Sequence, residues 1–360
     1  MASKIYNVGV IGYGLSAKVF HIPLVQVTPA FKLAAIVQRT PKPDDDASKD
    51  HPNAKIYHSA DELIADPSLD VIAITTTPET HFNFTKAALE AGKHVMVEKP
   101  FVPTSQEAQQ LSDISSKTGK LICVYQNRRW DSDFLTVRKL IDEGTLGRVV
   151  EFNTHFDRYK PSKPTNWKGT LGMDHAGGVV YDLGTHLIDQ AYVLFGLPKT
   201  VTAIFSNQRD DGDAEPDSVT VLLGYGSSGP LVTVKAGVLC VETDQLRYWV
   251  RGSKGSFKKF HLDVQEDQLK AGLKPGDKNF GVEDASRSGN LVVLKDGKPQ
   301  GSILANVEPE TYATIYDRFA KAIKTGDASA VPVKATEARD VLKIIEAAKE
   351  SAKSGKSVSL

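Results

Sequence analysis

The chain has 360 residues, of which 41% are hydrophobic and 24% charged, a composition typical of a globular protein large enough for two domains. Its 44 basic and 44 acidic side chains cancel, which argues against a protein that coats nucleic acid or an anionic membrane, because both need a standing positive field. Cys123 and Cys240 are the only two cysteines, so we expect neither a disulfide framework nor a thiolate metal cluster. The sequence has no run of about 18 apolar residues and no signal-peptide core, so we expect no membrane span. Together these features predict a cytoplasmic protein.

The first third of the chain alternates short apolar runs with longer amphipathic segments, which predicts βαβ units around a parallel sheet. The predicted strands are 6–11, 31–37, 56–58, 71–75, 94–97 and 121–125. The predicted helices are 17–27, one that begins at 59–62, 79–91 and 105–118, while the Asp-rich stretch 41–52 is a loop or a weak helix. This is the size of one doubly wound nucleotide-binding domain, so we expect a Rossmann domain over residues 1–126.

The pattern then changes to mostly strands separated by turn residues, which predicts a mixed or antiparallel sheet. The predicted strands are 149–156, 201–206, 218–225, 231–239, 246–252, 257–261, 291–294 and 303–305, and the predicted helices are 134–143, 179–195, 311–325 and 335–354. Segments 160–178 and 263–290 are expected to be loops. We therefore expect a second α/β domain over residues 127–360, and the sequence leaves open whether its last helix packs back on the first domain.

A G-x-G-x-x-A pattern at Gly12, Gly14 and Ala17 lies between the first strand and the first helix. Gly12 permits a tight turn, Gly14 lets the main chain approach a pyrophosphate, and Ala17 allows close packing of helix on sheet. A tight turn without a ligand is the alternative, but the position at the first βα turn favours a dinucleotide. The predicted cofactor contacts of this turn are Gly12, Tyr13, Gly14, Leu15 and Ser16.

The end of the second strand indicates which dinucleotide binds. An NAD site usually has an Asp or Glu about 20 residues after the glycines, but here the sequence is Gln38-Arg39-Thr40-Pro41-Lys42. The Arg39 guanidinium can fork onto a phosphate, so we predict NADP rather than NAD, with Arg39 as the main ligand of the 2′-phosphate and Thr40 and Lys42 as weaker ones. A solvated basic loop is the alternative, and the acidic run 44–46 nearby could weaken such a site.

Two further patterns suggest proton-transfer chemistry. Glu98 and Lys99 stand at the end of the fifth strand, where an open parallel sheet binds its ligand, and Lys99 can donate to a substrate oxygen. Asp182 and His186 are four residues apart on a predicted helix, where the carboxylate can orient an imidazole that accepts a proton. Each has an ordinary structural alternative, a surface lysine before a turn and a hydrogen-bonded pair on a helix surface.

These residues, together with several longer segments, resemble the Gfo/Idh/MocA family of NAD(P)-dependent sugar and cyclitol oxidoreductases over nearly the whole chain. The nearer likeness is to NADP-dependent scyllo-inositol dehydrogenases and their relatives. The segments that carry the resemblance are the glycine turn, 75–81, 91–100, the Asp182 and His186 pair, 18–23, 127–134 and 155–159.

The resemblance implies a Rossmann domain followed by an α/β domain with a large open, mostly antiparallel sheet, which in this family is often used for oligomer contacts. It implies the catalytic set Lys99, Asp182 and His186. Further cofactor contacts would come from Thr75, Thr76, Pro78, His81, Glu98, Lys99, Gln126 and Arg129. Substrate would be held by Asp157, Arg158, Tyr159 and Trp167 with the catalytic set, although Trp167 is equally explained as a loop-packing aromatic. Gln126 stands where the relatives have His.

The expected function is therefore hydride transfer between NADP and a hydroxyl or carbonyl carbon of an aldose or cyclitol, of the glucose, galactose or inositol type, with the substrate and direction left open. The alternative is a non-catalytic, NADP-sensing regulator of sugar metabolism with the same fold. A glycosidase that uses bound NAD transiently fits less well, because its central motifs differ. We expect no metal, no nucleic-acid partner and no membrane contact, and a homodimer or homotetramer formed through the second sheet.

Overall fold

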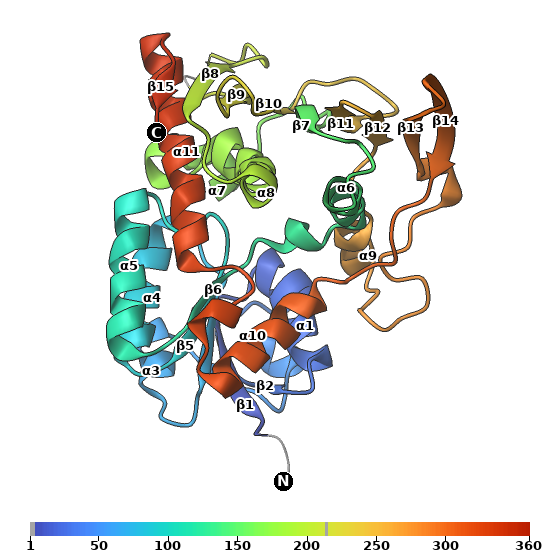
Figure 1. Ribbon diagram of the computed structural model, residues 1–360. Helices are drawn as coiled ribbons and strands as arrows, with labels where there is room; N and C mark the ends of the chain where they lie inside the picture. Colours follow the sequence, from blue (N-terminus) through green and yellow to red (C-terminus); the bar gives the residue numbers. More distant parts are fainter. Residues whose placement is uncertain (1–3, 213–214) are drawn as a thin grey trace. The chain divides into compact units, whose positions relative to one another are not determined.

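Figure 1 shows a computed structural model of the chain, in which residues 4–212 and 215–360 are described. The chain forms two compact units. Unit 1 contains the chain up to Asn127 together with residues 265–280 and 311–339, and unit 2 contains residues 128–264, 281–310 and 340–360. The first change of unit lies next to the predicted boundary at 126, but two later segments that the sequence assigns to the second domain are part of unit 1.

Unit 1 is built on a six-stranded parallel sheet with the strand order β3-β2-β1-β4-β5-β6. Its strands are apolar runs because helices cover both faces, and every residue of β4 is buried. The order reverses between β1 and β4, and ligands of such sheets bind at the carboxyl ends of the strands on either side of this point. The bounds are β1 (Tyr6–Ile11), β2 (Phe31–Val37), β3 (Lys55–Tyr57), β4 (Val71–Ile74), β5 (His94–Val97) and β6 (Ile122–Val124).

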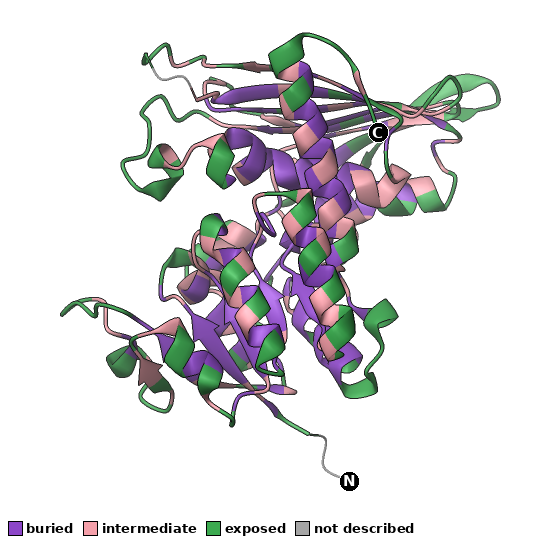
Figure 2. Cartoon of the chain, turned by 90° about the vertical axis from the view of Figure 1, so that its left-hand side faces the viewer, coloured by how far each residue is buried: buried purple, intermediate pink, exposed green. Residues whose placement is uncertain are grey.

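Helices α3, α4 and α5 lie on one side of this sheet, and α1 and α10 lie on the other (Figure 1). Figure 2 shows the strands between them as buried. Local signals fix the helix ends: Thr104 and Glu107 form a capping box at the start of α5, and Gly119 ends it in the left-handed conformation. The bounds are η1 (Ala17–His21), α1 (Ile22–Val27), α2 (Ala47–Asp50), α3 (Ala60–Ala65), α4 (Pro78–Glu90), α5 (Ser105–Thr118), α9 (Gln265–Lys270), α10 (Ala313–Thr325) and η6 (Ala328–Ala330).

Unit 2 contains a nine-stranded sheet in the order β14-β13-β12-β11-β7-β10-β9-β8-β15, in which β7 and β10 are parallel and the other neighbours antiparallel. The predicted α/β fold class is confirmed. The strands are β7 (Val149–Asp157), β8 (Thr200–Ser206), β9 (Ser218–Gly224), β10 (Leu231–Gly237), β11 (Leu246–Gly252), β12 (Gly255–Phe260), β13 (Gly289–Lys295), β14 (Lys298–Leu304) and β15 (Val358–Ser359). The helices are η2 (Asn127–Trp130), at the change of unit, α6 (Ser132–Asp142), α7 (Trp167–Thr170), η3 (Met173–His175), η4 (Val180–Gly184), α8 (Thr185–Phe195) and η5 (Ala285–Arg287).

The two faces of the nine-stranded sheet differ. One face packs on η4 and α8 and carries fully buried side chains such as Phe152, Val232 and Val250. On the other face, strand pairing places Leu222, Trp249 and Ile303 in one cross-strand row, and each is more than a third exposed. The sheet therefore has one covered face and one open face with large apolar side chains.

Short elements account for the differences from the sequence prediction. Helix α9 lies in the predicted loop 263–290, α7 and η3 lie in the predicted loop 160–178, and α2 resolves the stretch 41–52 as a loop that ends in a short helix. Strand β15 has two residues and was not predicted. Helix α11 (Ala335–Ser354) belongs to unit 1 up to Arg339 and to unit 2 beyond it. Among the described residues, no helix is long and apolar enough to cross a membrane.

Candidate active site

The glycine turn of unit 1 is shaped to receive a phosphate group. Gly12 has a φ of +105°, and a Cβ added to it would lie 2.8 Å from Thr75 Oγ1, so only glycine fits there without strain. A Cβ added to Gly14 would meet nothing within 4 Å, so open space faces this residue. The Lys18 main-chain N–H donates to the Gly14 carbonyl at 3.0 Å as the helical stretch begins, and a helix N-terminus favours an anion.

The segment after β4 forms the next part of the site. Thr75 donates from both its main-chain N–H and its hydroxyl to the Ile11 carbonyl, each at 3.0 Å. The Thr76 and Thr80 hydroxyls are 2.6 Å apart, and Pro78 opens helix α4. These contacts place Thr75 and Thr76 beside the glycine turn, at the switch point of the sheet.

His81 lies in α4 and has no exposed surface. Its ring nitrogens lie 3.1 Å from the Thr76 carbonyl oxygen and 3.0 Å from the Pro100 carbonyl oxygen, so it links the segments that follow β4 and β5. Burial lowers the pKa of His81, despite the opposing effect of these carbonyls, and favours the neutral ring. A contact of His81 with the nicotinamide ribose stays a prediction.

Glu98, at the end of β5, joins the glycine-turn helix to Lys99. Its Oε1 accepts hydrogen bonds from the Ser16 hydroxyl and from His21 Nε2, the latter at 2.9 Å, and its Oε2 accepts from the Lys99 main-chain N–H at 3.0 Å. Burial alone would raise the pKa of Glu98, but the hydrogen bond and charge of His21, with smaller contributions from Ser16 and Lys99, lower it to about 2. The carboxylate is therefore charged at neutral pH and fixes both neighbouring segments.

His21 is held in turn by Tyr316 of α10, whose hydroxyl lies 2.5 Å from Nδ1. Both side chains are buried, and the His21 ring also packs 4.5 Å from the ring of Tyr125. Both ring nitrogens therefore have a partner: Nε2–H donates to Glu98, and Nδ1 forms a hydrogen bond with the Tyr316 hydroxyl. The sequence gives no sign of this pair, because Tyr316 follows His21 by 295 residues and no local pattern connects them.

The loop after β2 carries the predicted phosphate ligands. Arg39, Thr40 and Lys42 are exposed, while Gln38 is buried and holds the loop. Gln38 Nε2 donates to the Asp45 carbonyl and its Oε1 accepts from the Ala47 N–H, both at 2.7 Å. Within the acidic run that follows, Asp46 caps α2, and Asp45 pairs with Lys18.

Gln126 and Arg129 lie on either side of the change of unit. Gln126 is buried in unit 1, and its Oε1 has no hydrogen-bond partner among the described residues. Arg129, in unit 2, donates from Nε and Nη2 to Asp189 at 2.8 and 2.7 Å. This bidentate pair holds the Arg129 guanidinium within unit 2, and the cofactor contacts predicted for both residues stay predictions.

Asp182 and His186 lie on the continuous helical stretch of η4 and α8, within unit 2. Asp182 is partly exposed and accepts a hydrogen bond from Lys168 Nζ at 2.9 Å. His186 is buried, and its ring lies 6.5 Å from that of Phe156. Because η4 is a π-type turn, the helix departs from regular α geometry where Asp182 stands, as helices often do at functional sites.

The predicted substrate residues fall into separate places in unit 2. The Arg158 guanidinium lies 4.7 Å from the Phe156 ring, which also contacts His186. Asp157 points to the other face of β7, where His155 Nδ1 lies 3.1 Å from it. Tyr159 is exposed, and its main chain forms an isolated antiparallel β-bridge with Leu239. Trp167 is 42% exposed at the start of α7. Of these residues, Arg158 is the one whose contacts connect it to His186.

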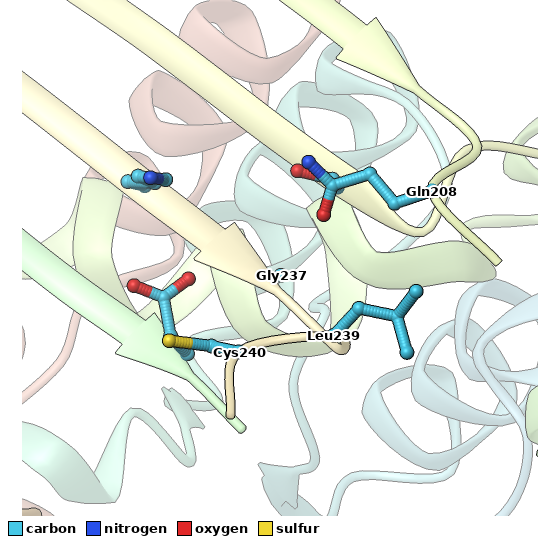
Figure 3. Close-up of a pocket in the computed structure, with 7 residues that line it drawn as sticks. Gln208, Gly237, Leu239 and Cys240 are labelled. Atoms are coloured by element: carbon cyan, nitrogen blue, oxygen red, sulfur yellow. The ribbon is translucent and has the colours of Figure 1, made fainter. Parts of the chain in front are cut away.

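Asp157 instead lines a pocket of about 170 Å³ at the carboxyl ends of β7 and β10 (Figure 3). Its lining residues are Asp157, Gln208, Ser218, Lys235, Gly237, Leu239 and Cys240. Across residues 4–212 and 215–360, no group of three His, Cys, Asp or Glu side chains could hold a metal ion, and no disulfide joins Cys123 to Cys240.

Comparison with known proteins gives matches over both parts of the chain. Residues 6–126 match the model "Oxidoreductase family, NAD-binding Rossmann fold", and residues 138–360 match "Oxidoreductase family, C-terminal alpha/beta domain". The chain is 37% identical to scyllo-inositol 2-dehydrogenase (NADP(+)) IolW of Bacillus subtilis, over 98% of this chain and 96% of that protein. It is 38% identical to the uncharacterized oxidoreductase YdgJ of Escherichia coli, over 96% of each chain. The solved structure of YvaA from Bacillus subtilis has a TM-score of 0.93 and 36% identity, covering 100% of this chain and 99% of that chain.

Proposed function

Because this chain belongs to the Gfo/Idh/MocA oxidoreductase family, as its sequence motifs indicated, we propose that it is an NADP-dependent dehydrogenase acting on CH–OH groups. Its substrate would be an aldose or a cyclitol. The observation that carries the proposal is the Glu98 network, in which one charged carboxylate holds both the helix of the glycine turn and the main chain of Lys99. The proposed dinucleotide site and the main chain of the proposed catalytic lysine thus share the same buried contacts.

The residues of unit 1 fit a dinucleotide. The positive φ of Gly12, the open space at Gly14 and the helix N-terminus after them provide room and hydrogen-bond donors for a pyrophosphate. Thr75, Thr76 and Pro78 would lie along the ribose that carries the nicotinamide. When bound, the nicotinamide supplies or accepts the hydride.

Three side chains are proposed to act on the substrate. The Lys99 ammonium holds the reacting oxygen and stabilises the negative charge that develops on it. His186 accepts the hydroxyl proton on oxidation or returns it on reduction, and Asp182 orients the substrate or His186. Arg158, which shares Phe156 with His186, is the best supported of the residues proposed to bind sugar hydroxyls.

NADP is proposed over NAD on two grounds. The loop after β2 exposes Arg39, Thr40 and Lys42 and has no acid at the position that usually binds the ribose hydroxyls. The B. subtilis relative that is 37% identical is named as an NADP(+) enzyme. An exposed guanidinium suits the 2′-phosphate because it can form two charge-assisted hydrogen bonds.

The test is a spectrophotometric screen of aldoses and cyclitols with NADP+ and NAD+ side by side. Wild type is expected to form NADPH with at least one of them, and Lys99→Ala to lower kcat at least about 100-fold while the Kd for NADP+ stays within about threefold. Lys86→Ala, at an exposed position of α4, is the control and should keep full activity. Tight NADP+ binding without turnover across the panel would instead favour the non-catalytic regulator.

We also propose that the protein is a cytoplasmic homodimer or homotetramer formed through the open face of the nine-stranded sheet. The support is the row of Leu222, Trp249 and Ile303, with Ile204 at 72% exposure on the same face. In this row Thr233 and Asn153 separate Leu222 from Trp249, and Lys258 and Asn290 separate Trp249 from Ile303, so the proposed contact surface is a mixed one in which exposed apolar side chains alternate with polar residues. The two unlinked cysteines fit a reducing compartment.

A further inference from the structure

Lys18 is a basic residue beside the glycine turn whose role the sequence did not indicate. It lies in η1, one turn after Gly14, and its Nζ is 2.5 Å from Asp45 Oδ1. The ammonium also lies 4.4 Å from the centre of the Tyr13 ring, so it stands over the residue between the two glycines. Lys18 therefore connects the glycine turn to the loop that follows β2.

This loop is where the adenosine ribose of a bound dinucleotide lies in a Rossmann domain. Gln38 fixes the loop through the Asp45 carbonyl and the Ala47 N–H, and Arg39 follows Gln38 directly. Tyr13 is anchored on the same side, because its hydroxyl donates to Asp50 of α2 at 2.6 Å. The ammonium of Lys18 is thus held in the region between the pyrophosphate turn and the 2′ position of the ribose.

We propose that Lys18 is a second ligand of the 2′-phosphate of NADP, and that the Asp45 carboxylate holds its ammonium until a phosphate replaces it. This inference rests on the proposed preference for NADP. The pair is partly exposed, with side-chain exposures of 35% for Lys18 and 40% for Asp45, so solvent screens it and weakens it. A phosphate carries a charge of about −1.5 to −2 at neutral pH, against −1 for a carboxylate, so it competes well for the same ammonium.

In this proposal Asp45 lowers the affinity for NADP and leaves the affinity for NAD unchanged. With NADP, the ammonium transfers from the carboxylate to the phosphate, and part of the binding free energy is used to break the Lys18–Asp45 pair. With NAD, which has no 2′-phosphate, the pair stays intact. Asp45 therefore weakens NADP binding, whereas Lys18 strengthens it, and neither residue acts on NAD.

The test is isothermal titration calorimetry of the full chain with NADP+, NAD+, 2′,5′-ADP and 5′-AMP. Lys18→Met should raise the Kd for NADP+ and for 2′,5′-ADP at least about tenfold. The Kd values for NAD+ and 5′-AMP should stay within about twofold of wild type. Asp45→Asn should lower the Kd for NADP+ and for 2′,5′-ADP about threefold or more. This gain in affinity should be absent in the double variant that also carries Lys18→Met. Lys49→Met is the matched control, because Lys49 is an exposed lysine of the neighbouring helix α2 and donates to the Pro43 carbonyl.

Two outcomes would overturn the inference. Equal weakening of NADP+ and NAD+ in Lys18→Met would show a structural role for Lys18, and unchanged or weaker NADP+ binding in Asp45→Asn would show that Asp45 does not compete with phosphate. Failure of the proposed function gives a different result, since wild type would then either bind neither dinucleotide or bind NADP+ without turnover in the substrate screen. Wild type that prefers NAD+ would contradict the coenzyme assignment and the role of Lys18 together.

Discussion

At the scale of single residues, the central feature is the charge on Glu98. A carboxylate buried without partners would be protonated, but His21, Ser16 and the Lys99 N–H all stabilise its charged form. Tyr316 completes the arrangement by holding the His21 ring through Nδ1. The position of the proposed proton donor thus depends on a charge that is itself set by three neighbouring groups.

This charge predicts how stability depends on pH. The pKa of Glu98 is about 2 in the folded chain and 4.5 in its ordinary state, so the unfolded chain binds more protons between these values. The stabilisation is fully present above pH 4.5 and is lost as the pH falls towards 2, by an amount on the order of 3 kcal/mol.

The measurement is the free energy of unfolding, obtained from urea denaturation at a series of pH values between 5.5 and about 2.5. Wild type should lose stability more steeply than Glu98→Gln, which has no titrating group at this position. Parallel curves for the two proteins would contradict the assigned charge. Glu90→Gln, at an exposed position at the end of α4, serves as the control and should follow wild type.

At the scale of elements, the two glycines of the β1–η1 turn are needed for different reasons. Gly12 is needed for the turn itself, because its φ is positive and a Cβ would clash with Thr75. Gly14 has no such constraint, since an added methyl group meets no protein atom within 4 Å. It is needed only if something approaches the main chain there.

Gly12→Ala should therefore lower both the free energy of unfolding, by about 1–3 kcal/mol, and the affinity for NADP+. Gly14→Ala should unfold like wild type and still bind NADP+ at least about tenfold more weakly, because the methyl group occupies the space of the pyrophosphate. Chemical denaturation and calorimetry measure the two effects separately. Normal NADP+ affinity in Gly14→Ala would place the phosphates elsewhere.

The same elements show how far the sequence could predict the structure. Hydrophobic runs and the glycine pattern predicted β1, β2, β4 and β5, because buried parallel strands are nearly continuous apolar segments. They could not predict that η1 and η4 are π-type turns, since this depends on the packing of side chains around them. The residues of α9 include acidic groups in its first turn and Lys270 in its last, a signal that was available, but the helix is short.

The candidate site was predictable where chemistry follows local motifs, and otherwise not. The glycine turn, Arg39 and the end of β5 are recognisable from neighbouring residues alone. The partners Tyr316 of His21 and Asp189 of Arg129 are far away in sequence, and their choice is made by the fold. Lys18 belonged to a segment used for the family resemblance, but its pairing with Asp45 appears only in three dimensions.

At the scale of the whole molecule, the open face of the nine-stranded sheet predicts self-association. Replacing Leu222 and Trp249 by Glu should shift the protein to a smaller species, because burying two carboxylates in an apolar contact is costly. Size-exclusion chromatography with light scattering measures the mass, and circular dichroism checks that the variant folds. A double variant on exposed helix positions, Lys86→Glu and Glu90→Lys, should keep the wild-type mass. A folded, unchanged oligomer in the Leu222 and Trp249 variant would exclude this face.

The division into units has a consequence for how the protein is made. Residues 311–339, with α10 and Tyr316, complete unit 1, although about half of the chain separates them from the first 127 residues. A ribosome that adds about 5–20 residues per second delivers them on the order of tens of seconds after β6. During that interval the nascent sheet lacks a helix on one face, and His21 lacks the phenol beside it. A gene fragment that ends at residue 127 would reproduce this unfinished intermediate permanently, so the first unit should be purified only as part of the complete chain.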